Sequence, residues 1–78
     1  MMKTLMPLGM ARPDEMVSVV AIKAGFGLKR RLADMGLSPG VSLRVIQSQV
    51  RGPVIIDLRG SRLALGRGMA QRILVQEA

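Results

Sequence analysis

The sequence contains no cysteine, histidine, tyrosine or tryptophan, and Phe26 is its only aromatic residue. Thiolate and imidazole, the groups that most often hold transition metals, are therefore both missing, and no disulfide can form. Histidine general-base catalysis and Ser-His-Asp or Cys-His arrangements are excluded for the same reason. The chain also lacks a GxSxG elbow and a phosphate-binding glycine loop. We therefore expect no enzyme, no metal site and no cofactor, and the absence of cysteine favours a cytoplasmic location.

Long hydrophobic runs are also missing. The longest stretch without a charge covers nine residues, 35–43, and glycine and proline interrupt it. A membrane-spanning helix needs about 20 predominantly apolar residues. The apolar start of the chain is short, and Arg-Pro-Asp-Glu follows it where a secretory signal would carry small residues at a cleavage site. We expect residues 1–12 to be the first segment of the domain rather than a leader.

What the chain does have is aliphatic residues and positive charge. It is 78 residues long, which predicts one domain over residues 1–78. Hydrophobic residues make up 49% of it, enough for a core without aromatic residues. Twelve Lys and Arg against five Asp and Glu give a net charge of +7. Such an excess indicates an anionic partner, either nucleic acid, an acidic lipid surface or an acidic protein surface.

Short apolar segments separated by glycine and proline predict strands joined by turns. The segment 16–22 is apolar on both faces and rich in valine, which predicts a central strand buried on both sides. Segment 41–45 alternates between apolar and polar residues, as expected for a strand with one buried face, and segment 54–58 places Val54, Ile56 and Leu58 on one face. We predict further strands at 62–65 and 73–76, with a tight turn at 59–61.

Two helical pieces interrupt the strands. In residues 27–35, Leu28, Leu32 and Met35 lie on one face of a two-turn helix, and the three basic residues 29–31 point mostly to water. Gly36 follows where a left-handed helix cap is needed, and Ser38-Pro39-Gly40-Val41 has the residues of a type II turn. A second helical turn is expected within 66–72. About five short strands with one or two short inserted helices predict an all-β fold, a small closed barrel; an open α+β arrangement is the alternative.

The ordered motifs RL-x-x-MGL-x-PG, GP followed by a strand, and ALGR-x-x-A-x-x-I-x-V resemble the FeoA family over residues 4–77. These are small cytosolic proteins that accompany the bacterial ferrous iron transporter FeoB. The resemblance implies an SH3-like barrel and a ferrous iron transport function, exerted by protein–protein contact with FeoB, in particular with its cytosolic nucleotide-binding region. Transition metal ion binding is a family-level description. Related domains form the C-terminal part of some metal-dependent transcriptional repressors, so a regulatory or nucleic-acid-binding barrel is the alternative.

The residues themselves suggest where a partner would bind. Two basic groups stand out, one in the predicted helix and one around the predicted turn at 59–61, and Leu37 is a candidate for an exposed apolar contact beside the Pro39-Gly40 turn. A solvated charged face is the plainer interpretation of the basic residues. No specific nucleic-acid binding is expected, because stacking aromatic residues are missing, and a homo-oligomer stays open. The candidate partner-binding residues are Lys29, Arg30, Arg31, Leu37, Arg59 and Arg62.

Overall fold

Strands dominate the structure, a computed structural model that describes residues 4–49 and 51–78. Residues 1–3 of the expected first segment lie outside the described residues. The elements in chain order are β1 (Met6–Pro7), the 3₁₀ helix η1 (Leu8–Met10), β2 (Met16–Ile22), α1 (Phe26–Asp34), β3 (Ser42–Ser48), β4 (Val54–Leu58), β5 (Ser61–Leu65), α2 (Arg67–Ala70) and β6 (Ile73–Glu77).

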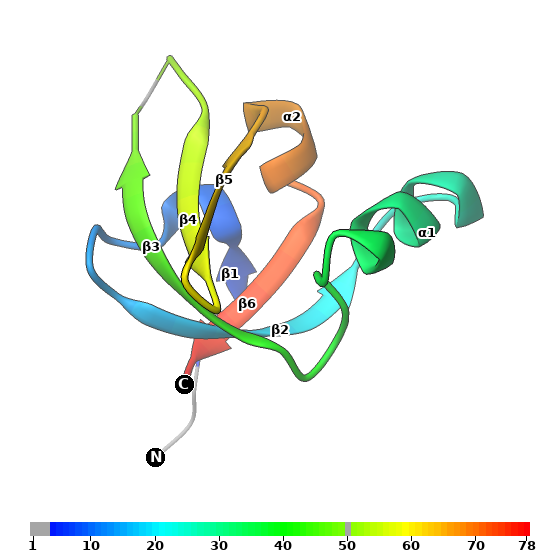
Figure 1. The fold of residues 1–78 in the computed structure, drawn as a ribbon, viewed down its shortest axis with the longest axis horizontal. Coiled ribbons are helices and arrows are strands. Elements are labelled where there is room, and N and C mark those ends of the chain that lie inside the picture. Colours follow the sequence, from blue (N-terminus) through cyan, green and yellow to red (C-terminus); the bar gives the residue numbers. More distant parts are fainter. Residues whose placement is uncertain (1–3, 50) are drawn as a thin grey trace.

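The six strands form one sheet in the order β1-β6-β2-β3-β4-β5, and every neighbouring pair is antiparallel. The sheet curls around its apolar face into a small barrel, and α1 projects beside it (Figure 1). The predicted all-β class is confirmed, and the strand limits differ from the predicted ones by at most three residues. The two-residue β1 was not predicted, since Met6-Pro7 is too short to show a periodicity.

The strand β2 differs from its prediction in one respect. It is central, between β6 and β3, but it is not buried on both faces: Met16 is 41% and Val20 36% exposed. The pairing with β6 shifts register between Val19 and Ala21, which is a β-bulge. Because a bulge inserts one extra residue, the inward positions change from Val17 and Val19 to Ile22. Val20 is consequently left at the surface.

The other strands follow the predicted alternation. Leu43 and Val45 of β3 are buried while Arg44 is exposed, and β4 buries every second residue from Val54 to Leu58. The buried residues among those described are all aliphatic, and no polar or charged residue is buried with them. The core therefore rests on apolar burial by close-packed branched side chains.

The predicted helix 27–35 corresponds to α1, and the predicted turn of helix within 66–72 to α2. The first segment of the chain is fixed by β1, which pairs with β6, and by η1. The Ser48 hydroxyl of β3 donates a hydrogen bond of 2.6 Å to the Gly9 carbonyl oxygen of η1. In the described part of the chain, none of the helices has the length and apolar character that crossing a membrane requires.

Candidate docking surface

The basic helix α1 is held to the barrel at its C-terminal end. Gly36 has a φ of +94°, and its backbone N–H donates to the Ala33 carbonyl oxygen at 2.9 Å. The Leu37 N–H donates to the Leu32 carbonyl oxygen at 2.8 Å. These two hydrogen bonds define a Schellman motif, in which a left-handed glycine reverses the chain after the last helical turn. The predicted glycine cap is therefore confirmed.

The expectation that Leu37 is an exposed apolar contact is wrong, because its side chain is fully buried. In a Schellman motif the residue after the glycine packs against the residue whose carbonyl accepts its N–H. Leu32 is that residue, and it is also fully buried. Leu37 thus anchors α1 to the core, and a ligand could reach it only from inside the pocket that it lines.

The three basic residues of α1, Lys29, Arg30 and Arg31, are exposed, as the helical periodicity predicts. Leu32, next in sequence, is buried, and Leu28 is half-buried. No ion pair is found for the three cations among the described residues, so their charges act at the surface uncompensated by direct contact. Their role in partner binding stays a prediction.

The second basic group lies at the β4–β5 turn. Arg59 and Gly60, the two central residues, have φ values of +54° and +87°, as in a type I′ hairpin turn. The Gly60 N–H donates to Asp57 Oδ1 at 2.9 Å, which fixes the turn from inside. Arg59 in the turn and Arg62 in β5 are both exposed. The predicted presentation of both arginines at one hairpin tip is therefore confirmed, and their contact with a partner stays a prediction.

Asp57 compensates this basic group only in part. In the sheet register, Asp57 of β4 lies opposite Arg62 of β5 on one side and Arg44 of β3 on the other. Residues opposite each other point to the same face of a sheet, so two guanidinium groups flank one carboxylate on the outer face. That carboxylate also accepts the hydrogen bond from Gly60. The outer face of β3, β4 and β5 therefore carries a net positive charge.

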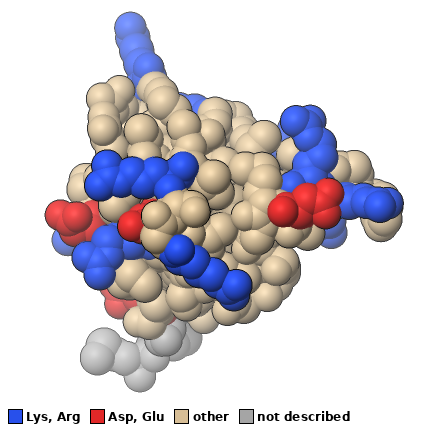
Figure 2. Space-filling model, viewed as in Figure 1, with Lys and Arg blue, Asp and Glu red and all other residues tan. Residues whose placement is uncertain are grey.

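The segment that follows α1 approaches the end of β4. A Cβ atom on Gly36, two residues after the end of α1, would lie 3.1 Å from Leu58 Cδ2, and Leu58 directly precedes Arg59. On the face drawn in Figure 2, basic side chains gather around α1 and over the barrel strands, with other residues between them. The charges thus form neighbouring groups rather than one unbroken patch. Arg67 does not join them, because it is half-buried near Gly9 of η1.

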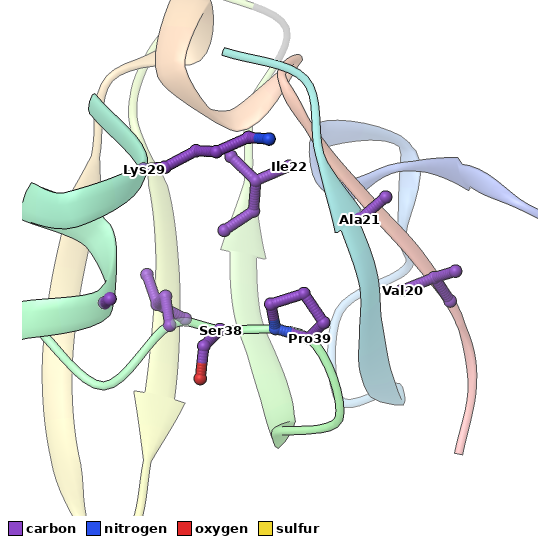
Figure 3. A pocket seen from close by; sticks show the side chains of 8 residues that line it. Val20, Ala21, Ile22, Lys29, Ser38 and Pro39 are labelled. Carbon is purple, nitrogen blue, oxygen red and sulfur yellow. The ribbon is translucent and has the colours of Figure 1, made fainter. Parts of the chain in front are cut away.

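A pocket of about 340 Å³ separates α1 from β2, and sequence reasoning missed it. In Figure 3, Lys29 extends from α1 across one end of the pocket towards Ile22 of β2, and Ser38 and Pro39 close the other end. Val20, Ala21 and Ile22 of its lining lie at or just after the bulge in β2, for which no local sequence signal exists. It is lined by Val20, Ala21, Ile22, Lys29, Ala33, Leu37, Ser38 and Pro39.

Oxygen ligands for a metal ion do not gather in the described residues, where no group of three Asp or Glu side chains could hold one. The arrangement offers instead an apolar hollow and exposed cations. Those features suit contact with an acidic and partly apolar surface.

Comparison with known proteins identifies the family of the chain. The family model described as the FeoA domain matches residues 6–77, and the chain belongs to the FeoA domain family. A protein of Methanocaldococcus jannaschii named "Putative Fe(2+) transport protein A" is 47% identical over 72 residues, which cover 92% of this chain and 87% of that protein. FeoA proteins are accessory proteins of ferrous iron transport.

Solved structures share the fold. A crystal structure described as an iron uptake regulatory protein (FeoA) is 36% identical, with a TM-score of 0.89 over 96% of this chain and all of that chain. A manganese-dependent transcriptional repressor is 24% identical, with a TM-score of 0.85 over all of this chain but only 44% of the repressor. The predicted SH3-like barrel is confirmed by the FeoA structures, and the repressor shares the fold alone.

Proposed function

We propose that this protein is a non-enzymatic, cytoplasmic accessory of ferrous iron uptake that acts by binding the cytosolic nucleotide-binding region of the transporter FeoB. Membership of the FeoA domain family is the single observation that carries the proposal. The iron transport named for the Methanocaldococcus jannaschii relative supports it. Iron is then the cargo of the transporter, and this chain contributes a contact surface.

The charge distribution supports a protein surface as the target. The cations of α1 and of the β4–β5 turn are exposed, and the segment that follows α1 approaches the end of β4. Complementary charge mainly accelerates encounter and fixes orientation, and single charges at the rim of an interface contribute little to affinity. We therefore expect that Arg31, Arg59 and Arg62, which lie outside the lining of the pocket between α1 and β2, must be reversed together before binding weakens strongly.

The test compares two triple variants of equal net charge. Arg31→Glu/Arg59→Glu/Arg62→Glu reverses the proposed surface, and Arg12→Glu/Arg51→Glu/Arg72→Glu reverses three exposed arginines elsewhere. Each variant has a net charge of +1, since three reversals remove six units from +7. Binding to the purified cytosolic region of FeoB is measured by biolayer interferometry, iron uptake is measured in cells, and circular dichroism checks the fold.

The first variant should slow association by at least about tenfold and reduce uptake, while the control should stay within about threefold of the parent. Equal losses in both variants would mean that only net charge matters. If the first variant is folded and its binding and uptake equal those of the parent, the basic surface does not contribute to partner binding.

A regulatory or nucleic-acid-binding barrel is the second candidate, and the repressor contributes to it only the shared fold. The shared part is less than half of that repressor, so the similarity concerns one of its domains and not its activity. Binding to nucleic acid by this chain would depend on phosphate contacts from its arginines, which are sequence-independent and sensitive to salt.

A further inference from the structure

The pocket between α1 and β2 has walls that a partner side chain would fill better than water. Val20, Ala21 and Ile22 of β2 form one wall, and Leu37 and Pro39 close it from the segment that follows α1. These side chains offer no hydrogen-bond partner to water. An apolar occupant is bound favourably in an apolar pocket, because the apolar surfaces of both the pocket and the occupant are removed from water.

Its size limits what can bind. Its volume of about 340 Å³ is roughly twice that of a 150 Å³ cavity that holds one benzene molecule. It lies at the lower end of small-molecule pockets, about 300–1,000 Å³. One or two aliphatic or aromatic side chains of a protein segment match it, and large cofactors do not.

Lys29 adds a charge requirement. Among the described residues that line the pocket it is the only charged one, and no described carboxylate pairs with it. Figure 3 shows its side chain lying across the pocket end beside Ile22, with the ammonium group at the far tip. An aliphatic stem along apolar surface with its charge at the mouth is the usual arrangement for a partly covered lysine. A carboxylate on the occupant would meet this ammonium group.

Phe26 extends the same face of α1. Residues 26, 29 and 33 are spaced by three and four positions, so they lie along one side of the helix. Lys29 and Ala33 line the pocket, and Phe26 lies one turn beyond Lys29 with 79% of its surface exposed. A large exposed aromatic residue next to an apolar hollow resembles the anchor regions of protein interfaces.

We propose that this pocket binds a short segment of the partner protein, which inserts one or two apolar side chains between α1 and β2 and places a carboxylate beside Lys29. The inference rests on the proposed function, because it takes that partner to be FeoB. A second copy of this chain is a poorer occupant, since two molecules of charge +7 repel each other.

Two substitutions test the pocket, each with a matched control. Ala33→Trp places an indole in the pocket from an exposed helical position, and Met35→Trp adds the same group just after the helix, outside the lining. Lys29→Glu reverses the lining charge, and Arg51→Glu makes the same change at the exposed β3–β4 loop. All four positions are exposed, so the variants should fold, and thermal melts check this.

The probe is the purified cytosolic region of FeoB, and the readout is its dissociation constant for each variant. Ala33→Trp and Lys29→Glu should each weaken binding by at least about tenfold, and each control should stay within about threefold. In methyl NMR spectra of the parent, the methyl signals of Val20, Ile22 and Leu37 should shift on binding.

The outcomes separate the pocket from the function. If the parent binds FeoB and folded Ala33→Trp and Lys29→Glu bind equally well, the pocket proposal is overturned and the proposed function stands. If the parent itself does not bind, the proposed function fails. If the parent is a dimer in sedimentation and Ala33→Trp converts it to a monomer, the occupant is a second copy of this chain. If Ala33→Trp loses binding to phosphatidylglycerol vesicles but keeps binding to FeoB, the occupant is a lipid. Both results overturn the proposal.

Discussion

Replacing Gly36 by alanine tests how α1 is joined to the barrel. Gly36 has a φ of +94°, and an added Cβ would lie 3.1 Å from Leu58 Cδ2. Gly40 in the following turn has a φ of +96° and nothing within 4 Å of an added Cβ. The two glycines therefore share the backbone conformation and differ in the contact, so Gly40→Ala is a matched control.

The expected losses in the free energy of unfolding follow from the backbone conformation and from the contact with Leu58. A left-handed conformation costs an alanine about 1–2 kcal/mol, and the stiffer unfolded chain returns about 0.4–1 kcal/mol, so Gly40→Ala should lower the free energy of unfolding by about 1 kcal/mol. At Gly36 the methyl group also requires Leu58 Cδ2 to move by a few tenths of an ångström, for which we expect a further loss of about 1 kcal/mol. A loss of 1 kcal/mol lowers the Tm of a domain this small by about 4–8 °C.

Thermal unfolding followed by circular dichroism measures both variants. Gly36→Ala should lower the Tm about twice as much as Gly40→Ala, and shortening the neighbour by Leu58→Val should reduce that excess in a double-mutant cycle. Equal losses at the two positions would refute the contact argument. No loss at either position would refute the claim that the left-handed conformation requires glycine.

Three further results are expected. Arg59→Asn should raise the Tm by a few degrees, because asparagine adopts the left-handed conformation of a type I′ turn more readily than arginine; a lower Tm would mean that the arginine side chain stabilises the turn. Anaerobic calorimetry with ferrous iron should reveal no site tighter than about 10 µM, since imidazole and thiolate are missing; a stoichiometric submicromolar isotherm would contradict this. Gel-shift titrations should show only non-specific DNA or RNA binding, which is lost as salt rises through about 0.05–0.2 M; nanomolar affinity for one sequence at physiological salt would favour the regulatory alternative.

Local chemistry was enough to predict most of the fold. Alternating apolar residues located β3 and β4, and the glycines after α1 and in the β4–β5 turn have the positive φ values that their positions required. Local patterns also predicted that the basic residues of α1 and of that turn are exposed.

What local patterns could not predict depends on contacts between distant segments. Leu37 follows a turn and looks exposed in the sequence, yet the Schellman motif turns it into the core. The bulge after Val19 follows from how β2 pairs with β6, and no residue in β2 predicts it. The pocket is lined by the bulged part of β2 and by Leu37, so neither its position nor the part of Lys29 in its lining could be predicted from the sequence.

The most direct measurement for the proposed function is a binding isotherm between this protein and the purified cytosolic region of FeoB from the same genome, recorded at low and at physiological salt. We expect saturable binding with one molecule of each partner, weakened by salt mainly through slower association, because the exposed cations promote encounter. A flat isotherm up to about 100 µM at both salt concentrations, a range in which even weak specific contacts of about −5 kcal/mol begin to register, would contradict a function by direct contact with the transporter.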